Sequence, residues 1–194
     1  GNDDVYIEKF IDAPRHIEVQ VIGDSHGNFV HLYERDCSVQ RRNQKVIEEA
    51  MAPGIDNDEK VKLFETVINA IKEMGYLGLG TLEFLYHEGK FYFMEMNTRL
   101  QVEHPITEMI TRIDLVREQI SVAAGEKLSF DQSKINPLGH SIECRINAED
   151  PLTFKPSAGT IDLYHPPAGN GIRLDTFIYS GYKVPHYYDN LLAK

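Results

Sequence analysis

The sequence predicts an α+β fold, on three observations. Two pairs of segments alternate apolar and polar residues around a turn, which is the pattern of β-hairpins. Segments with apolar residues at helical spacing lie between and after these hairpins, in no strict strand–helix–strand alternation. After Pro137 the chain changes to short strand-like runs separated by turns rich in Gly and Pro. We therefore expect a largely antiparallel sheet with helices packed on it, rather than a doubly wound parallel sheet.

The strands are expected in two hairpins near the start and the middle of the chain. The first pairs residues 16–22 with residues 28–34 across a turn that contains Gly and Asp. The second pairs residues 81–86 with residues 91–97. A further short strand is expected at residues 5–7, before the first hairpin.

The helices are expected after each hairpin. The spacing of apolar residues over residues 61–74 predicts a helix of about five turns, opened by the capping pair Asp56 and Glu59. A longer helical stretch covers residues 105–125 and breaks near Asp114. The remaining strands are short and are expected at residues 140–146, 160–164 and 172–179.

Composition and charge exclude several classes of protein. The chain has 194 residues, of which 20 are Lys or Arg and 30 are Asp or Glu, so its formal net charge is -10. With 42% hydrophobic and 26% charged residues, it has the composition of an ordinary globular protein. No apolar run approaches the roughly 20 residues that span a bilayer, so we expect no membrane function. The excess of acid also disfavours a bulk electrostatic grip on nucleic acid.

The cysteines and the chain ends add two expectations. Cys37 and Cys144 are the only cysteines and lack metal-ligand spacing, which favours a reducing, cytosol-like compartment, with both as buried small side chains. Nothing near Gly1 resembles a signal peptide. The chain starts without Met in an apparent strand and stops in what reads as the interior of an element. We expect a piece of a longer protein.

The segment FYFMEMNTRLQVE, residues 91–103, is the most informative for function. In an extended chain, alternate residues share one face. That face would carry five polar side chains, namely Glu95, Asn97, Arg99, Gln101 and Glu103. A solvated strand face is the alternative interpretation. The position between apolar strand residues and an apolar helix favours a convergent functional face instead.

The second hairpin predicts a metal site. With a three-residue loop over residues 88–90, Glu83 lies opposite Glu95, with side chains about 5 Å apart. Like charges at that position destabilise a sheet unless a hard cation lies between them, and Mg²⁺ usually takes one or two protein carboxylates plus substrate phosphates. A loop of two or four residues would instead place the two glutamates on opposite faces.

A second candidate is the basic cluster over residues 35–45, which holds four cations and three amides. Such a cluster is typical of an anion cradle, although a solvated basic loop paired with Glu34, Glu48 and Glu49 is equally compatible with it. Arg145 is expected to point away from its apolar neighbours on an alternating strand. No P-loop, GxGxxG or HExxH spacing is present in the sequence.

Five strings of this sequence resemble one known family. They are EKFIDAPRHIEVQV, ERDCSVQRRNQK, EEAMAPGI, FMEMNTRLQVEHPITE and ECRINAEDP. Together they are similar to biotin carboxylase, the ATP-grasp component of acetyl-CoA carboxylase and its relatives, from about Val5 to the last residue. The resemblance implies an ATP-grasp C-terminal lobe over residues 1–134. It implies the truncated start of the biotin carboxylase C-terminal region over residues 135–194.

The resemblance also implies roles for the site residues. Metal ions, Mg²⁺ or Mn²⁺, would bridge the phosphates of ATP and be held by Glu83, Glu95 and Asn97. Bicarbonate would be held by Lys45, Arg99, Gln101 and the backbone of Val102. Glu103 would be the base that deprotonates bicarbonate, and Arg145 would stabilise the enolate-like oxyanion of biotin. The nucleotide would meet Glu8, Lys9 and Ile11 near the adenine, His16 and Gln40 near the ribose and phosphates, and Leu85 on the base.

Two positions depart from the family pattern. Asn43 stands where the family most often has His at a nucleotide contact, and Met51 stands where it usually has Pro. The lid and the lysines that grip ATP in this family would lie before Gly1, so we expect the chain alone not to turn over.

Partners and location follow from the same resemblance. It implies ATP, bicarbonate, biotin on a carrier protein, a carboxyltransferase component and a homodimer. The location would be the cytoplasm, or the mitochondrial matrix for a eukaryotic-type parent. The parent could be an acetyl-CoA carboxylase, which serves fatty acid biosynthesis, or a propionyl-CoA or pyruvate carboxylase. Two alternatives stay open: another ATP-grasp ligase, and a non-catalytic scaffold or dimerisation module.

Overall fold

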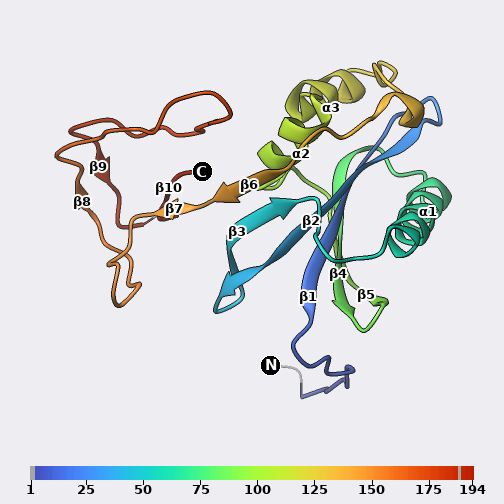
Figure 1. The fold of residues 1–194 in the computed structure, drawn as a ribbon, viewed down its shortest axis with the longest axis horizontal. Coiled ribbons are helices and arrows are strands. Elements are labelled where there is room, and N and C mark those ends of the chain that lie inside the picture. Colours follow the sequence, from blue (N-terminus) through green and yellow to red (C-terminus); the bar gives the residue numbers. More distant parts are fainter. Residues whose placement is uncertain (1–2, 188) are drawn as a thin grey trace.

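A six-stranded antiparallel sheet forms the centre of the molecule (Figure 1). The computed structural model describes residues 3–187 and 189–194. The strand order is β5-β4-β1-β2-β3-β6. The strands are β1 (Arg15–Gly23), β2 (Phe29–Arg41), β3 (Gln44–Ala50), β4 (Gly78–His87), β5 (Lys90–Asn97) and β6 (Ser141–Cys144). The expected α+β class and both expected hairpins are confirmed.

The two faces of the central strand β1 differ in chemistry. Ile17, Val19 and Val21 belong to the main apolar cluster. Glu18 and Gln20 alternate with them and are also fully buried. Since β1 has a strand on each side, one face of the sheet becomes an apolar core and the other a buried polar layer.

Helix α1 (Asn57–Glu73) covers the apolar face. Asp56 is its N-cap and accepts a hydrogen bond from the Asp58 amide. Glu59 does not complete the expected capping pair: its carboxylate instead accepts a hydrogen bond of 2.8 Å from the Tyr86 hydroxyl. The buried residues of α1 are Leu63, Phe64, Val67 and Ile71.

Two shorter helices, α2 (His104–Thr111) and α3 (Leu115–Ala123), cover the opposite face. The helical stretch breaks where expected, because Arg112 has a left-handed backbone with φ of 61° and Asp114 caps α3. Thr107 of α2 accepts a hydrogen bond from Arg35 of β2. The polar layer of the sheet is therefore enclosed by α2.

Beyond β6 the chain forms a separate arm of short elements, drawn in orange and red in Figure 1. A single 3₁₀ turn (Gln132–Lys134) precedes β6, and the arm pairs β7 (Ile146–Asn147) with β10 (Leu191–Ala193) and β8 (Gly159–Thr160) with β9 (Lys183–Val184). The expectation of strands over residues 160–164 and 172–179 was mostly wrong. Only Thr160 lies in a strand, and Thr176 forms an isolated bridge to Ala193. These runs have strand-like composition, but among the described residues their backbone pairing is limited to a few hydrogen bonds, from Ile161 to residues 181–182 and between Asp175 and Lys194.

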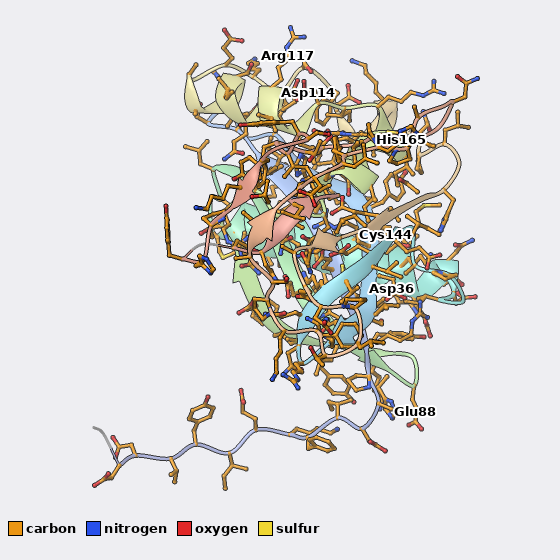
Figure 2. The ribbon with its side chains drawn as sticks, turned by 90° about the vertical axis from the view of Figure 1, so that its left-hand side faces the viewer. Asp36, Glu88, Asp114, Arg117, Cys144 and His165 are labelled. Atoms are coloured by element: carbon orange, nitrogen blue, oxygen red, sulfur yellow. The ribbon has the colours of Figure 1, made fainter. Side chains whose placement is uncertain are left out.

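The expected strand at residues 5–7 was also wrong. Figure 2 shows the N-terminal segment running away from the sheet as an extended chain, and residues 5–7 do not form a strand. Cys37 is buried as expected, whereas Cys144 is exposed on the outer side of β6. None of the helices in the described part of the chain is long and apolar enough to cross a membrane.

Candidate active site

A cavity of about 710 Å³ lies at the polar layer of the sheet. It brings together twelve of the residues that the sequence predicted for the site. They are His16, Gln40, Lys45, Glu83, Leu85, Glu95, Asn97, Arg99, Gln101, Val102, Glu103 and Arg145. Asn43, at the position that departs from the family pattern, lines the same cavity. The twelve predicted residues come from five strands and two loops and converge on one space.

Three predicted residues do not reach this cavity. Glu8, Lys9 and Ile11 belong to the N-terminal segment, and none of them is among the residues that line the cavity. The Lys9 ammonium lies 3.4 Å from the hydroxyl of Tyr92, near the turn of the second hairpin. Their predicted contacts with adenine remain predictions.

Glu83 and Glu95 do lie opposite each other across β4 and β5. The loop has two residues rather than three, because Glu88 and Gly89 both take positive φ and form a tight turn. A register shift between Glu83 and Phe84, at Met94, then inserts one residue and restores the pairing. The expected pair is present, but the expected reason for it was wrong.

Asn97 joins the two carboxylates on that face. Its side-chain amide donates to Glu83 at 3.0 Å and to Glu95 at 3.2 Å. Carboxylate and amide oxygens are hard ligands of the kind that Mg²⁺ prefers. The donor set of these three residues fits a divalent cation.

Lys45 connects this acidic group to the rest of the cavity. Its ammonium lies 2.5 Å from Glu18, 3.0 Å from Glu83 and 2.6 Å from Glu103. Burial opposes the charge on Lys45, but the surrounding carboxylates, Glu18 foremost, outweigh it and raise the pKa of the ammonium group. Lys45 is therefore a fixed positive charge at the floor of the cavity.

Glu103 is held between two cations. One carboxylate oxygen contacts Lys45, and the other accepts a hydrogen bond of 3.0 Å from the Arg145 guanidinium. The residue is only 2% exposed and occupies the N-cap position of α2. A buried carboxylate between two cations suits a base that receives a proton from a bound anion.

His16 and Gln40 form the side of the cavity nearest to Glu83. His16 Nε2 lies 2.9 Å from a Glu83 oxygen, and Gln40 Nε2 lies 3.0 Å from His16 Nδ1. Burial disfavours the charged imidazole, but hydrogen bonds to Glu18 and Glu83 outweigh burial and raise the pKa of His16 to about 9. His16 is therefore cationic at neutral pH.

The basic cluster over residues 35–45 does not act as one cradle. Arg35 is fully buried under the cavity, and Arg41 pairs with Glu149 at 2.6 Å and 2.8 Å. The alternative of a solvated loop fails as well, because Glu34 pairs with Lys60 and Glu48 with Arg145. Among its cations, only Lys45 reaches the cavity.

Sequence reasoning missed the residues that support the cavity from below. Arg35 donates to Glu18 at 2.5 Å, to Gln20 at 2.6 Å and to Gln101 at 2.9 Å. The signal was present, because Glu18 and Gln20 alternate with three apolar residues in β1. That alternation is typical of a solvated face, and only the position of β1 inside the sheet shows that this face is enclosed.

The fold and the cavity define a class of protein. One face of an antiparallel sheet carries acidic side chains that can hold a cation and positively charged side chains that can hold an anion. The family model described as the ATP binding domain of the carbamoyl-phosphate synthase L chain matches residues 1–131. The chain thus contains an ATP-binding domain of the ATP-grasp class.

The comparisons with known proteins narrow this class. The biotin carboxylase C-terminal domain model matches residues 143–194. The biotin carboxylase of Pseudomonas aeruginosa is 57% identical over 194 residues, which are 100% of this chain and 43% of that protein. A pyruvate carboxylase subunit of Methanothermobacter thermautotrophicus is 52% identical, over 100% of this chain and 40% of that protein. The chain belongs to the biotin carboxylase family and spans less than half the length of these relatives.

A solved structure agrees with this assignment. The biotin carboxylase domain of Hydrogenobacter thermophilus 2-oxoglutarate carboxylase was solved as a dimer with MgADP, ADP and bicarbonate. It is 52% identical to this chain and matches it with a TM-score of 0.93, over 96% of this chain and 42% of that one.

Proposed function

We propose that this chain supplies the bicarbonate and metal half of a biotin carboxylase site. In a protein of the relatives' full length, that site would use ATP and bicarbonate to carboxylate biotin on a carrier protein. The relatives named above are, by name, a biotin carboxylase, a pyruvate carboxylase subunit and the biotin carboxylase domain of a 2-oxoglutarate carboxylase, which disfavours another ATP-grasp ligase. We assign residues 1–134 to the ATP-binding lobe and residues 135–194 to the start of the C-terminal region.

Glu83, Glu95 and Asn97 would hold the divalent cation. When bound, the cation would neutralise the charge of the ATP phosphates during phosphoryl transfer. The chain's own contribution is to keep Glu83 ionised. Burial raises the pKa of Glu83, but hydrogen bonding to His16 and the nearby Lys45 charge outweigh it and lower the pKa overall.

The observation that carries the proposal is the position of Glu103 between Lys45 and Arg145. Bicarbonate placed among Lys45, Arg99 and Gln101 would be bound by positive charge and an amide, beside a carboxylate that can take its proton. The deprotonated oxygen would then attack the γ-phosphate of ATP to give carboxyphosphate and ADP. Carboxyphosphate would break down to CO₂ and phosphate. Arg145 would stabilise the oxyanion of biotin when biotin takes up the released CO₂.

The experiment measures two activities of a full-length protein that carries this chain. We expect ATP hydrolysis that requires bicarbonate, and carboxylation of free biotin that requires both ATP and bicarbonate. The Glu103→Gln variant is the matched control and should lose both activities. ATP hydrolysis that is indifferent to bicarbonate would refute the proposal. The chain alone should show neither activity, because half a nucleotide site neither clamps the phosphates nor excludes water.

A further inference from the structure

A second pair of acids lies behind Arg145, outside the cavity. Glu48 of β3 and Glu143 of β6 are direct partners in the antiparallel ladder. Their side chains are buried, with Glu48 at 0% and Glu143 at 5% exposure. Like charges directly opposite each other destabilise a sheet, and burial adds to the cost. The stability lost by placing two buried acids here suggests that the pair has a functional role.

Glu48 contacts Arg145 from the side away from the cavity. The Nε atom of Arg145 donates to Glu48 at 2.6 Å, while its Nη2 atom donates to Glu103 at 3.0 Å. Within the described part of the chain, no hydrogen bond involves Nη1 of Arg145. The guanidinium is thus fixed at two corners, and its remaining donors are available to a ligand in the cavity.

Glu143 makes no such contact. Neither of its buried carboxylate oxygens has a hydrogen-bond partner among the described residues. The charged groups that face it are Glu48, Glu103, Arg145 and Lys194. Burial foremost, and then the charge of Glu48, raise the pKa of Glu143 to about 8. Burial raises the pKa of Glu48 as well, but of the two acids only Glu48 has a cationic hydrogen-bond partner, Arg145, among the described residues.

We propose that Glu48 is a positioning residue that anchors Arg145 through Nε, so that the free edge of the guanidinium faces biotin. The inference deepens the proposed function and rests on the role proposed there for Arg145. Without the hydrogen bond to Glu48, Glu103 would be the remaining carboxylate partner of Arg145. The position of the guanidinium would then depend on Glu103 alone. The distance and orientation of the free donors would then no longer be set by the sheet.

The test compares Glu48→Gln with Glu49→Gln in a full-length protein that carries this chain. Glu49 is the next residue of β3, and its carboxylate pairs with His140 at 2.7 Å, away from the cavity. The readout is the ratio of biotin carboxylation to bicarbonate-dependent ATP hydrolysis, which a general loss of folding would not change. In Glu48→Gln this ratio should fall by about tenfold or more, the equivalent of one charge-assisted hydrogen bond. In Glu49→Gln it should stay at the unmodified value.

Each outcome separates this inference from the proposed function. If the unmodified protein does not carboxylate biotin, both the proposed function and this inference are refuted. If it does, and Glu48→Gln keeps the unmodified ratio, the positioning role alone is overturned. An equal fall in Glu143→Gln would also overturn it, since that result would make Glu143 the charged partner.

A double substitution and a direct observation complete the test. In an Arg145→Lys background, which lacks Nε, Glu48→Gln should cause little further change in the ratio, whereas a full additional loss would contradict the coupling. If Glu48→Gln does not fold, ¹⁵N NMR of the unmodified protein decides the question. An Arg145 Nε–H signal that exchanges slowly with solvent supports the anchor, and exchange as fast as that of an exposed arginine overturns it.

Discussion

Replacing Arg35 with Met should strongly destabilise the chain, because Arg35 compensates a buried acid. Its guanidinium is fully buried and donates to Glu18 at 2.5 Å. Removing one partner of a buried ion pair costs about 3 to 5 kcal/mol, since the other charge is left without compensation. Lys45 remains 2.5 Å from the other oxygen of Glu18. We therefore expect the lower end of that range, about 3 kcal/mol.

Urea unfolding of the chain, followed by circular dichroism, measures this loss. With a denaturant slope of about 2 kcal/mol per molar, the midpoint should fall by about 1.5 M. The double variant Arg35→Met with Glu18→Gln removes the isolated charge and should recover part of the loss. A loss under about 1 kcal/mol, or a double variant no more stable than Arg35→Met, would refute the reasoning.

Replacing Arg35 with Met should also weaken the binding of bicarbonate at the proposed anion site. Arg35 Nη2 donates to the side-chain oxygen of Gln101 at 2.9 Å, while the Gln101 amide donates to Glu83 at 2.7 Å. Without Arg35, the Gln101 amide is free to turn. In a full-length protein the KM for bicarbonate should therefore rise, as measured by steady-state ATP hydrolysis. An unchanged KM would separate the stability role of Arg35 from the site.

Three further predictions concern the base, the metal and the pH dependence of stability. Glu103→Gln should lower kcat by roughly 10²- to 10⁴-fold, whereas Arg99→Ala should mainly raise the KM for bicarbonate; a nearly unchanged kcat in Glu103→Gln would contradict the role of base. Glu95→Gln should weaken Mn²⁺ binding by about tenfold or more in calorimetric titration, and equal affinity would remove Glu95 from the metal site. Burial opposes the charge of Asp24, but hydrogen bonds, first among them that from Asn28, lower its pKa to about 2. Asp24 therefore adds about 2 kcal/mol to the free energy of unfolding. This contribution is fully present above the pKa of Asp24 in the unfolded chain and is lost as the pH falls through about 2. Asp24→Asn should be less stable than the unmodified chain at pH 7, with the gap closing by pH 2, and a constant gap would be inconsistent with this linkage.

The second hairpin shows both the strength and the limit of reading the sequence. Alternation placed Glu83 and Glu95 in paired strands, and the structure pairs them. The prediction assumed a three-residue loop, whereas the chain makes a two-residue turn and a register shift at Met94. A bulge leaves little trace in the local pattern of residues, so its position followed only from the folded sheet.

The convergent face over residues 91–103 is a similar case. The strand ends at Asn97, so Arg99, Gln101 and Glu103 are not held by strand geometry. They still line the cavity together with Glu95 and Asn97. The polar pattern therefore identified the right residues, while the turn before α2, rather than a continuous strand, places the last three.

The sequence by itself determined the two hairpins, the positions of the main helices and the family of this protein. Strand alternation, helix spacing and the break before Asp114 depend on neighbouring residues, and such patterns are readable along the chain. The tertiary structure alone decided which charges are buried and what they contact. Glu18, Arg35, Glu48 and Glu143 come from four different strands, and their burial depends on the strand order β5-β4-β1-β2-β3-β6. A polar residue that alternates with apolar ones reads as solvated until another strand or helix is known to cover it, because the burial of a charge is set by long-range neighbours.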